Sequence, residues 1–149
     1  MNLIDKKYII LELIPTKSKD GDIAQLSALK LDGLKLLERF DYRLDKELIK
    51  IPELLNMLNY DNDAFKYVKT TKEIMDNFKN FIEDLPLLIV DNDYTREYLK
   101  TIKNEKISVF SYFDIEVSYE AFEKLIEKYN LEPSNHFVDL LYEALIKEL

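Results

Sequence analysis

The side chains best suited to metal chemistry in this chain are a few carboxylates and its single histidine. Glu12 lies inside an apolar run, Asp91 and Asp93 follow another apolar run, and Asp139 lies three residues after His136. Carboxylate oxygens are the ligands that magnesium prefers, and an imidazole with a pKa near neutrality can act as a general base. These acids are therefore candidates for metal ligands, and His136 is a candidate base.

Each of these residues also has a structural interpretation. Asp91 and Asp93 are of a type that forms turns and caps helices, and they follow a predicted strand. Ligands of open α/β sheets bind at the carboxyl ends of strands, so the same position also suits substitute metal ligands. His136 precedes a helical pattern, where a polar residue needs no catalytic role. Both interpretations stay open at this stage.

Length and composition favour one compact domain covering residues 1–149. Hydrophobic residues make up 47% of the chain, and no linker rich in proline, glycine or serine divides it. The formal net charge of -8 argues against a sequence-independent grip on phosphate backbone. The absence of cysteine excludes thiolate catalysis and cysteine-based zinc sites, and it suits a reducing compartment.

Two further absences narrow the classes of protein. The N-terminal residues lack the apolar core of a signal peptide, and no run approaches the roughly 20 apolar residues of a membrane helix, so we expect a cytoplasmic protein without a membrane partner. The only glycines are Gly21 and Gly33, which leaves no glycine-rich loop for a phosphate, so we expect no nucleotide cofactor.

The N-terminal part of the chain has the pattern of a β-meander. Residues 8–13 form a short β-branched and apolar run, and residues 22–31 alternate well enough for a second strand. Asp32-Gly33 then predicts a tight hairpin turn into a third strand over about residues 34–43.

Helices and short strands alternate in the rest of the chain. Thr70 and Glu73 form a capping box for a helix over 71–83, and a continuous apolar run at 87–90 predicts a covered strand. The remaining predicted elements are a helix over 46–59, a helix over 94–102 capped by Asp93, a strand over 107–110, a helix capped by Ser118 and a C-terminal helix from about 137. This order predicts an α/β fold of the ribonuclease H-like kind, with a mixed sheet of about five strands flanked by helices.

Several segments resemble the DEDDh (DnaQ-like) family of 3′–5′ exonucleases. The opening strand followed by Asp22 to Gly33 and Glu38-Arg39-Phe40 is similar to the first strands of that family. The run that ends at Asn92 resembles the family's strand before a His-Asn pair, and Asn135-His136 resembles the stretch that carries its catalytic histidine. The resemblance implies two magnesium ions that activate water against a phosphodiester.

The acids that would hold those ions are altered. Glu12 stands where the family has its first aspartate, and Ile14 stands where it has a glutamate. The third acid falls on Arg96 and the fourth on Leu141, while Asp139 lies three residues beyond His136 instead of five. Only His136 keeps its expected type and place. We therefore predict that Glu12 forms an ion pair with Arg96 in the space of the lost metals, because an unpaired buried charge is costly.

The resemblance and these departures predict a degenerate exonuclease-like protein that binds a nucleic-acid 3′ end or a protein partner. It would need no cofactor. The first alternative is an active 3′–5′ exonuclease that uses magnesium or manganese, with Glu12, Asp91 or Asp93, Asp139 and His136 as an unusual ligand set. The second is an acidic protein that occupies the nucleic-acid channel of a partner, which only the net charge suggests.

Overall fold

The computed structural model describes residues 3–16, 22–45, 65–117, 120–132 and 137–149. The predicted helix over 46–59, the Ser118 cap and His136 lie outside these ranges. All structural statements below concern the described residues.

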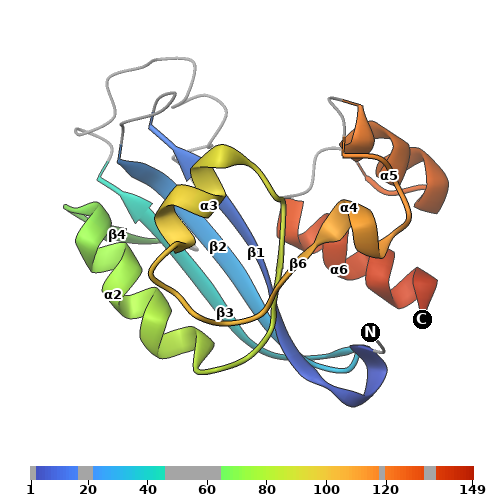
Figure 1. The fold of residues 1–149 in the computed structure, drawn as a ribbon, viewed down its shortest axis with the longest axis horizontal. Coiled ribbons are helices and arrows are strands. Elements are labelled where there is room, and N and C mark those ends of the chain that lie inside the picture. Colours follow the sequence, from blue (N-terminus) through green and yellow to red (C-terminus); the bar gives the residue numbers. More distant parts are fainter. Residues whose placement is uncertain (1–2, 17–21, 46–64, 118–119, 133–136) are drawn as a thin grey trace.

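A mixed six-stranded sheet forms the centre of the fold (Figure 1). Its order is β4-β3-β2-β1-β5-β6, and the strands are β1 (Lys7–Pro15), β2 (Ile23–Asp32), β3 (Lys35–Leu44), β4 (Lys66–Val68), β5 (Leu87–Ile89) and β6 (Lys106–Ser108). The β1–β2 and β2–β3 pairs are antiparallel, and the other neighbours are parallel. The predicted α/β class and three-strand meander are confirmed, and β4 adds a strand that the sequence pattern did not predict.

Helices cover both faces of this sheet. They are the short 3-10 helix η1 (Leu3–Asp5), α2 (Thr71–Ile82), α3 (Asp93–Leu99), α4 (Val109–Tyr112), α5 (Ala121–Tyr129) and α6 (Phe137–Glu148). Figure 1 shows α2 and α3 on one side of the strands and α4, α5 and α6 on the other. This arrangement is compatible with a ribonuclease H-like fold. None of the described helices is long and apolar enough to cross a membrane.

Alternation along the strands creates a separate apolar core on each face. On β1, Tyr8 and Ile10 join the core beneath α6, whereas Ile9 and Leu11 join the core beneath α2. Since successive side chains of a strand point to opposite faces, the continuous apolar run of β1 serves both cores.

Helix starts follow local capping chemistry. The side chain of Thr70 accepts a 3.1 Å hydrogen bond from the Glu73 backbone N–H, which confirms the predicted cap of α2. At α3 the prediction was wrong by one residue, because Asn92 and not Asp93 is the cap. The Asn92 side chain accepts from the Thr95 N–H at 3.0 Å, and Asp93 is the first helical residue. The strand predicted over 107–110 is shorter than expected, because β6 ends at Ser108 and Val109 begins α4.

The hairpin between β2 and β3 turns at Gly33, as predicted. Gly33 has a φ of +61°, and a Cβ atom there would lie 2.6 Å from the Ile4 carbonyl oxygen. The Tyr8 hydroxyl donates a 2.8 Å hydrogen bond to the Gly33 carbonyl. Backbone conformation and close approach therefore both require glycine at this turn.

Candidate functional site

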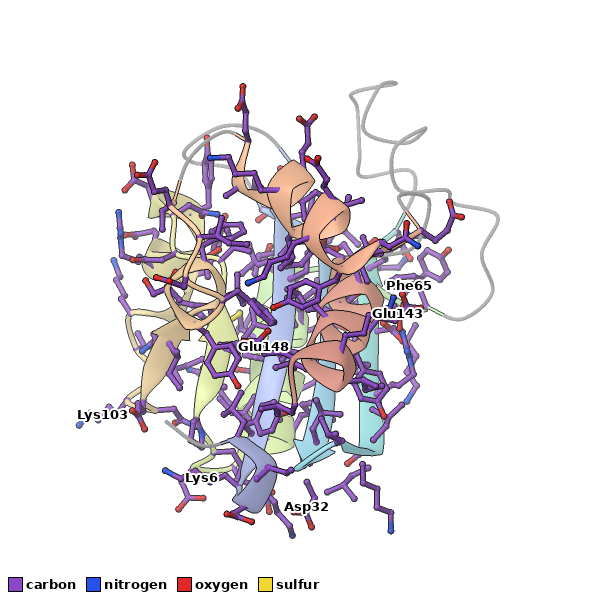
Figure 2. The ribbon with its side chains drawn as sticks, turned by 90° about the vertical axis from the view of Figure 1, so that its right-hand side faces the viewer. Lys6, Asp32, Phe65, Lys103, Glu143 and Glu148 are labelled. Carbon is purple, nitrogen blue, oxygen red and sulfur yellow. The ribbon has the colours of Figure 1, made fainter. Side chains whose placement is uncertain are left out.

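A group of polar side chains interrupts the apolar sheet face on the α6 side. We call it the polar cluster; it comprises Glu12 on β1, Gln25 and Ser27 on β2, Arg39, Asp41 and Arg43 on β3, and Asp139 on α6. Strand register brings these residues together, because Glu12 pairs with Ser27, Ser27 with Asp41, and Gln25 with Arg43. Residues opposite each other on neighbouring strands point to the same face. Figure 2 looks onto this side of the sheet, with α6 in front of the strands.

Gln25 is the centre of the hydrogen-bond network in the cluster. Its amide nitrogen lies 3.3 Å from Glu12 Oε1 and 3.3 Å from Ser27 Oγ, and its carbonyl oxygen accepts a 2.7 Å bond from Arg43 Nε. Gln25 and Ser27 are each only 1% exposed. Glu12 is thus linked to Arg43 through a neutral amide.

Arg43 is fully buried at the outer end of this network. Its exposed fraction is 0%, and its guanidinium carbon lies 3.7 Å from the centre of the Phe65 ring. An arginine held by stacking and by a short hydrogen bond has a fixed orientation. Arg43 therefore places a permanent positive charge beside the carboxylates of the cluster.

Arg39 connects β3 to the first turn of α6. Its Nη1 atom donates to Asp139 Oδ1 at 2.8 Å, and its Nε atom donates to Asp41 Oδ2 at 3.2 Å. The bond to Asp139 is the main reason that the pKa of Arg39 lies above its usual value. One guanidinium is therefore shared by two carboxylates.

Glu12 is the carboxyl group whose protonation is most altered. Its pKa is raised from 4.5 to about 7, mainly because the group is buried and in smaller part because Asp139 places a negative charge nearby. The hydrogen bond from Gln25 and the charge of Arg43 act in the opposite direction. Near neutral pH the Glu12 carboxyl is thus divided between its neutral and ionised forms.

This set of residues does not fit a pair of magnesium ions. Ile14, which pairs with Gln25, puts a hydrocarbon side chain where the family resemblance implies a ligand. Asp139 is held by Arg39, and Arg43 adds a second guanidinium close to Glu12. No group of three or more acidic or histidine residues within the described part of the chain is placed to hold a metal ion. Two hard cations need several free carboxylate oxygens, which this cluster does not offer.

The predicted ion pair between Glu12 and Arg96 is wrong. Arg96 lies on α3 and binds Asp91 at 3.0 Å and also Asp93, whereas Glu12 has Gln25 as its partner. The reason is topological: α3 packs its Leu99 into the core on the α2 side, while Glu12 faces α6. The structure thus brings Asp91 and Asp93 to Arg96 and not to Glu12 and Asp139.

The two candidate positions on α6 have opposite surroundings. Leu141 is 0% exposed and belongs to the apolar core, so the position that the resemblance assigns to a fourth acid contributes to packing. Asp139 instead joins the polar cluster through Arg39, although its spacing from His136 departs from the family pattern.

The residues that sequence reasoning missed are those on β2 and β3. Gln25 and Ser27 share the parity of Leu29 and Leu31, which places them on the buried α6 side of β2. Even extension of the Asp32-Gly33 hairpin would have placed Phe40 and Tyr42 opposite them. A β-bulge between Lys30 and Leu31 shifts the pairing by one residue and brings Asp41 and Arg43 there instead. Two polar residues at inward positions of one strand were therefore an available signal.

Comparison with known proteins does not assign the chain to a family. No model of a protein family matches it, and no curated protein matches it significantly.

Proposed function

We propose that this protein is a degenerate 3′–5′ exonuclease-like domain that acts by binding and not by metal-dependent hydrolysis. The observation that supports this proposal best is the hydrogen bond from Arg39 to Asp139. Asp139 is the candidate substitute metal ligand on α6, and this bond occupies one of its carboxylate oxygens. Its partners would be a single-stranded nucleic-acid end or another protein.

The charges of the polar cluster support the loss of hydrolysis. Arg39 and Arg43 offset Asp41 and Asp139, and Glu12 is only partly ionised near neutrality. Binding magnesium there would require the Arg39 contacts to break and would place each ion close to a guanidinium. Catalysis of phosphodiester cleavage by this family's chemistry depends on two such ions. The internal pairs therefore take the place that metal coordination would need.

A nuclease assay tests the loss of hydrolysis. Single-stranded DNA and RNA carrying a label at the 3′ end are incubated with the protein and with magnesium or manganese. We expect no shortening above that seen with Glu12→Ala. The control is Glu123→Ala, which changes a carboxylate on α5 outside the cluster. Shortening that Glu12→Ala abolishes and Glu123→Ala preserves would establish an active enzyme and overturn the proposal.

The binding part of the proposal needs a separate measurement. Fluorescence anisotropy of the same labelled strands is recorded in EDTA, where a metal-dependent complex cannot form. Saturable binding that is equal in EDTA and in magnesium is expected for a nucleic-acid-binding domain without a metal site. Strands that bind only when magnesium is present would argue for a retained metal centre.

A further inference from the structure

A groove lies mainly on the opposite side of the sheet from the polar cluster. It has a volume of about 330 Å³ and lies between α2 and the strands β3 and β4. Its lining comprises Lys30, Glu38, Arg39, Phe40, Tyr42, Lys66, Asn77, Asn80, Phe81 and Glu83. Figure 1 shows α2 running alongside the β3 and β4 side of the sheet. A volume of this size is in the range of small-molecule pockets.

Aromatic rings form one part of the groove. The centre of the Phe40 ring lies 4.4 Å from that of Tyr42 and 5.2 Å from that of Phe81. Phe40 and Phe81 are buried, whereas Tyr42 is half-buried and so keeps part of its surface accessible. An aromatic side chain in this state can stack on a planar ring of a ligand.

Hydrogen-bonding groups lie beside these rings. Asn77 and Asn80 are both exposed on α2, one turn apart. The Asn77 side-chain amide donates a 2.9 Å hydrogen bond to the Glu73 backbone carbonyl. The Asn77 side-chain oxygen therefore remains an acceptor, and the Asn80 amide supplies both a donor and an acceptor. Before Tyr42, moreover, no strand within the described ranges pairs with the outer edge of β3. A heterocycle with donors and acceptors on its edge could hydrogen-bond to these asparagine amides and to the exposed backbone edge of β3.

The positive charges of the groove are not equally available. Lys30 lies 3.6 Å from Glu38 and 3.4 Å from Glu83, and Arg39 is held by Asp41 and Asp139. Lys66 is exposed, its ammonium lies 5.7 Å from the centre of the Tyr42 ring, and it has no ion pair with any described residue. One available cation next to a stacking surface favours a ligand that joins a planar ring to an anionic group.

We propose that this groove binds one nucleotide, with its base stacked on Tyr42, the base edge facing Asn77 and Asn80, and its phosphate at Lys66. The nucleotide is either a free nucleoside monophosphate or one unit of a single strand, since both present the same chemistry. Arg39 is the one residue of the polar cluster that also lines the groove, and Asp41 and Asp139 hold its guanidinium. The proposed contacts use Tyr42, Lys66 and the two asparagines, so the site stands independently of whether the protein hydrolyses nucleic acid.

Nucleoside monophosphates titrated into isotope-labelled protein, followed by two-dimensional amide NMR, test the site. We expect saturable shifts around the groove with at least one of AMP, GMP, CMP and UMP, and weaker binding of the matching nucleoside. A short single strand is the second arm, and tighter binding of that strand at the same residues identifies the strand as the source. The absence of saturable shifts with every nucleotide and strand overturns the proposal.

Variants locate the ligand. Tyr42→Ala is expected to weaken nucleotide binding about tenfold or more, and Tyr42→Phe to retain it, because stacking needs the ring alone. Lys66→Gln is expected to reduce the affinity of the monophosphate to that of its nucleoside; this variant also carries the test should Tyr42→Ala fail to fold. Tyr67→Ala and Lys72→Gln are controls that remove an exposed ring and an exposed cation elsewhere. Binding that Glu12→Ala abolishes while Tyr42→Ala and Lys66→Gln preserve it would place the ligand in the polar cluster and refute the groove.

Discussion

Arg39 on β3 donates a 2.8 Å hydrogen bond to Asp139 in the first turn of α6, although 100 residues separate them in the sequence. This bond joins the meander to the C-terminal helix. It also brings the Asp139 charge close enough to Glu12 to raise the pKa of that carboxyl. The protonation of the Glu12 carboxyl on β1 thus depends on where α6 places Asp139.

This coupling predicts the effect of Asp139→Asn. The amide keeps an oxygen that can accept from Arg39, but it removes the negative charge beside Glu12. We expect the pKa of Glu12 to fall from about 7 toward its ordinary value. Loss of the half-exposed ion pair should cost at most about 1 kcal/mol of stability. A carbon-detected NMR titration of the Glu12 carboxyl measures the shift. Glu143→Gln, one turn further along α6, is the control, and an equal fall there would refute a specific effect of Asp139.

Glu12→Gln should change how stability depends on pH. In the wild type the folded-state pKa is raised to about 7 from 4.5, so below about pH 4.5 both folded and unfolded states hold the proton. Between pH 4.5 and about 7, Glu12 loses its proton in the unfolded state but keeps it in the folded state. The free energy of unfolding therefore falls as the pH rises through this range. Glutamine removes this loss while still accepting from Gln25. The variant should therefore match the wild type near pH 4 and exceed it above pH 7, by about 3 kcal/mol.

Urea unfolding at pH 4, 6 and 8 measures this difference directly. Because other groups titrate in both proteins, the quantity of interest is the variant value minus the wild-type value at each pH. Glu123→Gln on α5 supplies the matched carboxylate-to-amide change and should show no such trend. A difference that is constant across the three pH values would contradict a raised pKa for Glu12.

The elements with strong local signals were predictable. The Asp32-Gly33 turn, the Thr70 cap and the apolar pattern of α6 each depend on neighbouring residues alone, and each appears in the structure. The short strand β4 has no such signal. It consists of Lys66–Val68 and exists through its parallel pairing with Tyr42 to Leu44, a contact between distant segments. Pairing of this kind overrides the weak local preference of three residues.

The candidate site was predictable only in part. Glu12 and Asp139 were among the candidates, but their true partners depend on which face each helix covers. The family resemblance predicted Arg96 beside Glu12, but α3 packs on the other side of the sheet. The guanidinium groups near Glu12 are those of Arg39 and Arg43, which β3 supplies. Side-chain partners across strands depend on register, and a β-bulge between Lys30 and Leu31 shifts the register of β2 and β3 by one residue. The hairpin turn alone therefore could not identify these partners.

Arg43→Lys should be strongly destabilising despite retaining the charge. A lysine has no donor at the Nε position that bonds Gln25 at 2.7 Å, and it lacks the planar group that lies over Phe65. The buried Gln25 oxygen would lose its partner and a buried ammonium would lack a matching site, so we expect a loss of about 3 kcal/mol. Urea unfolding measures it. Arg39→Lys is the matched control at the half-exposed position, where a loss below about 1 kcal/mol is expected.

If the polar cluster is a former metal site, restoring acids should restore affinity for a divalent cation. The variant that tests this combines Glu12→Asp and Ile14→Glu with Arg39→Ala, which frees Asp139. Ile14 shares the sheet face of Glu12 through its pairing with Gln25, so the new carboxylate would point into the cluster. We expect manganese binding at about 0.1–1 mM, the range of weak carboxylate sites, whereas the wild type should show none in that range. Electron paramagnetic resonance of free manganese measures the bound fraction. The control replaces Ile14→Glu with Ile14→Gln in the same background, and equal binding by both variants would show that position 14 contributes no ligand.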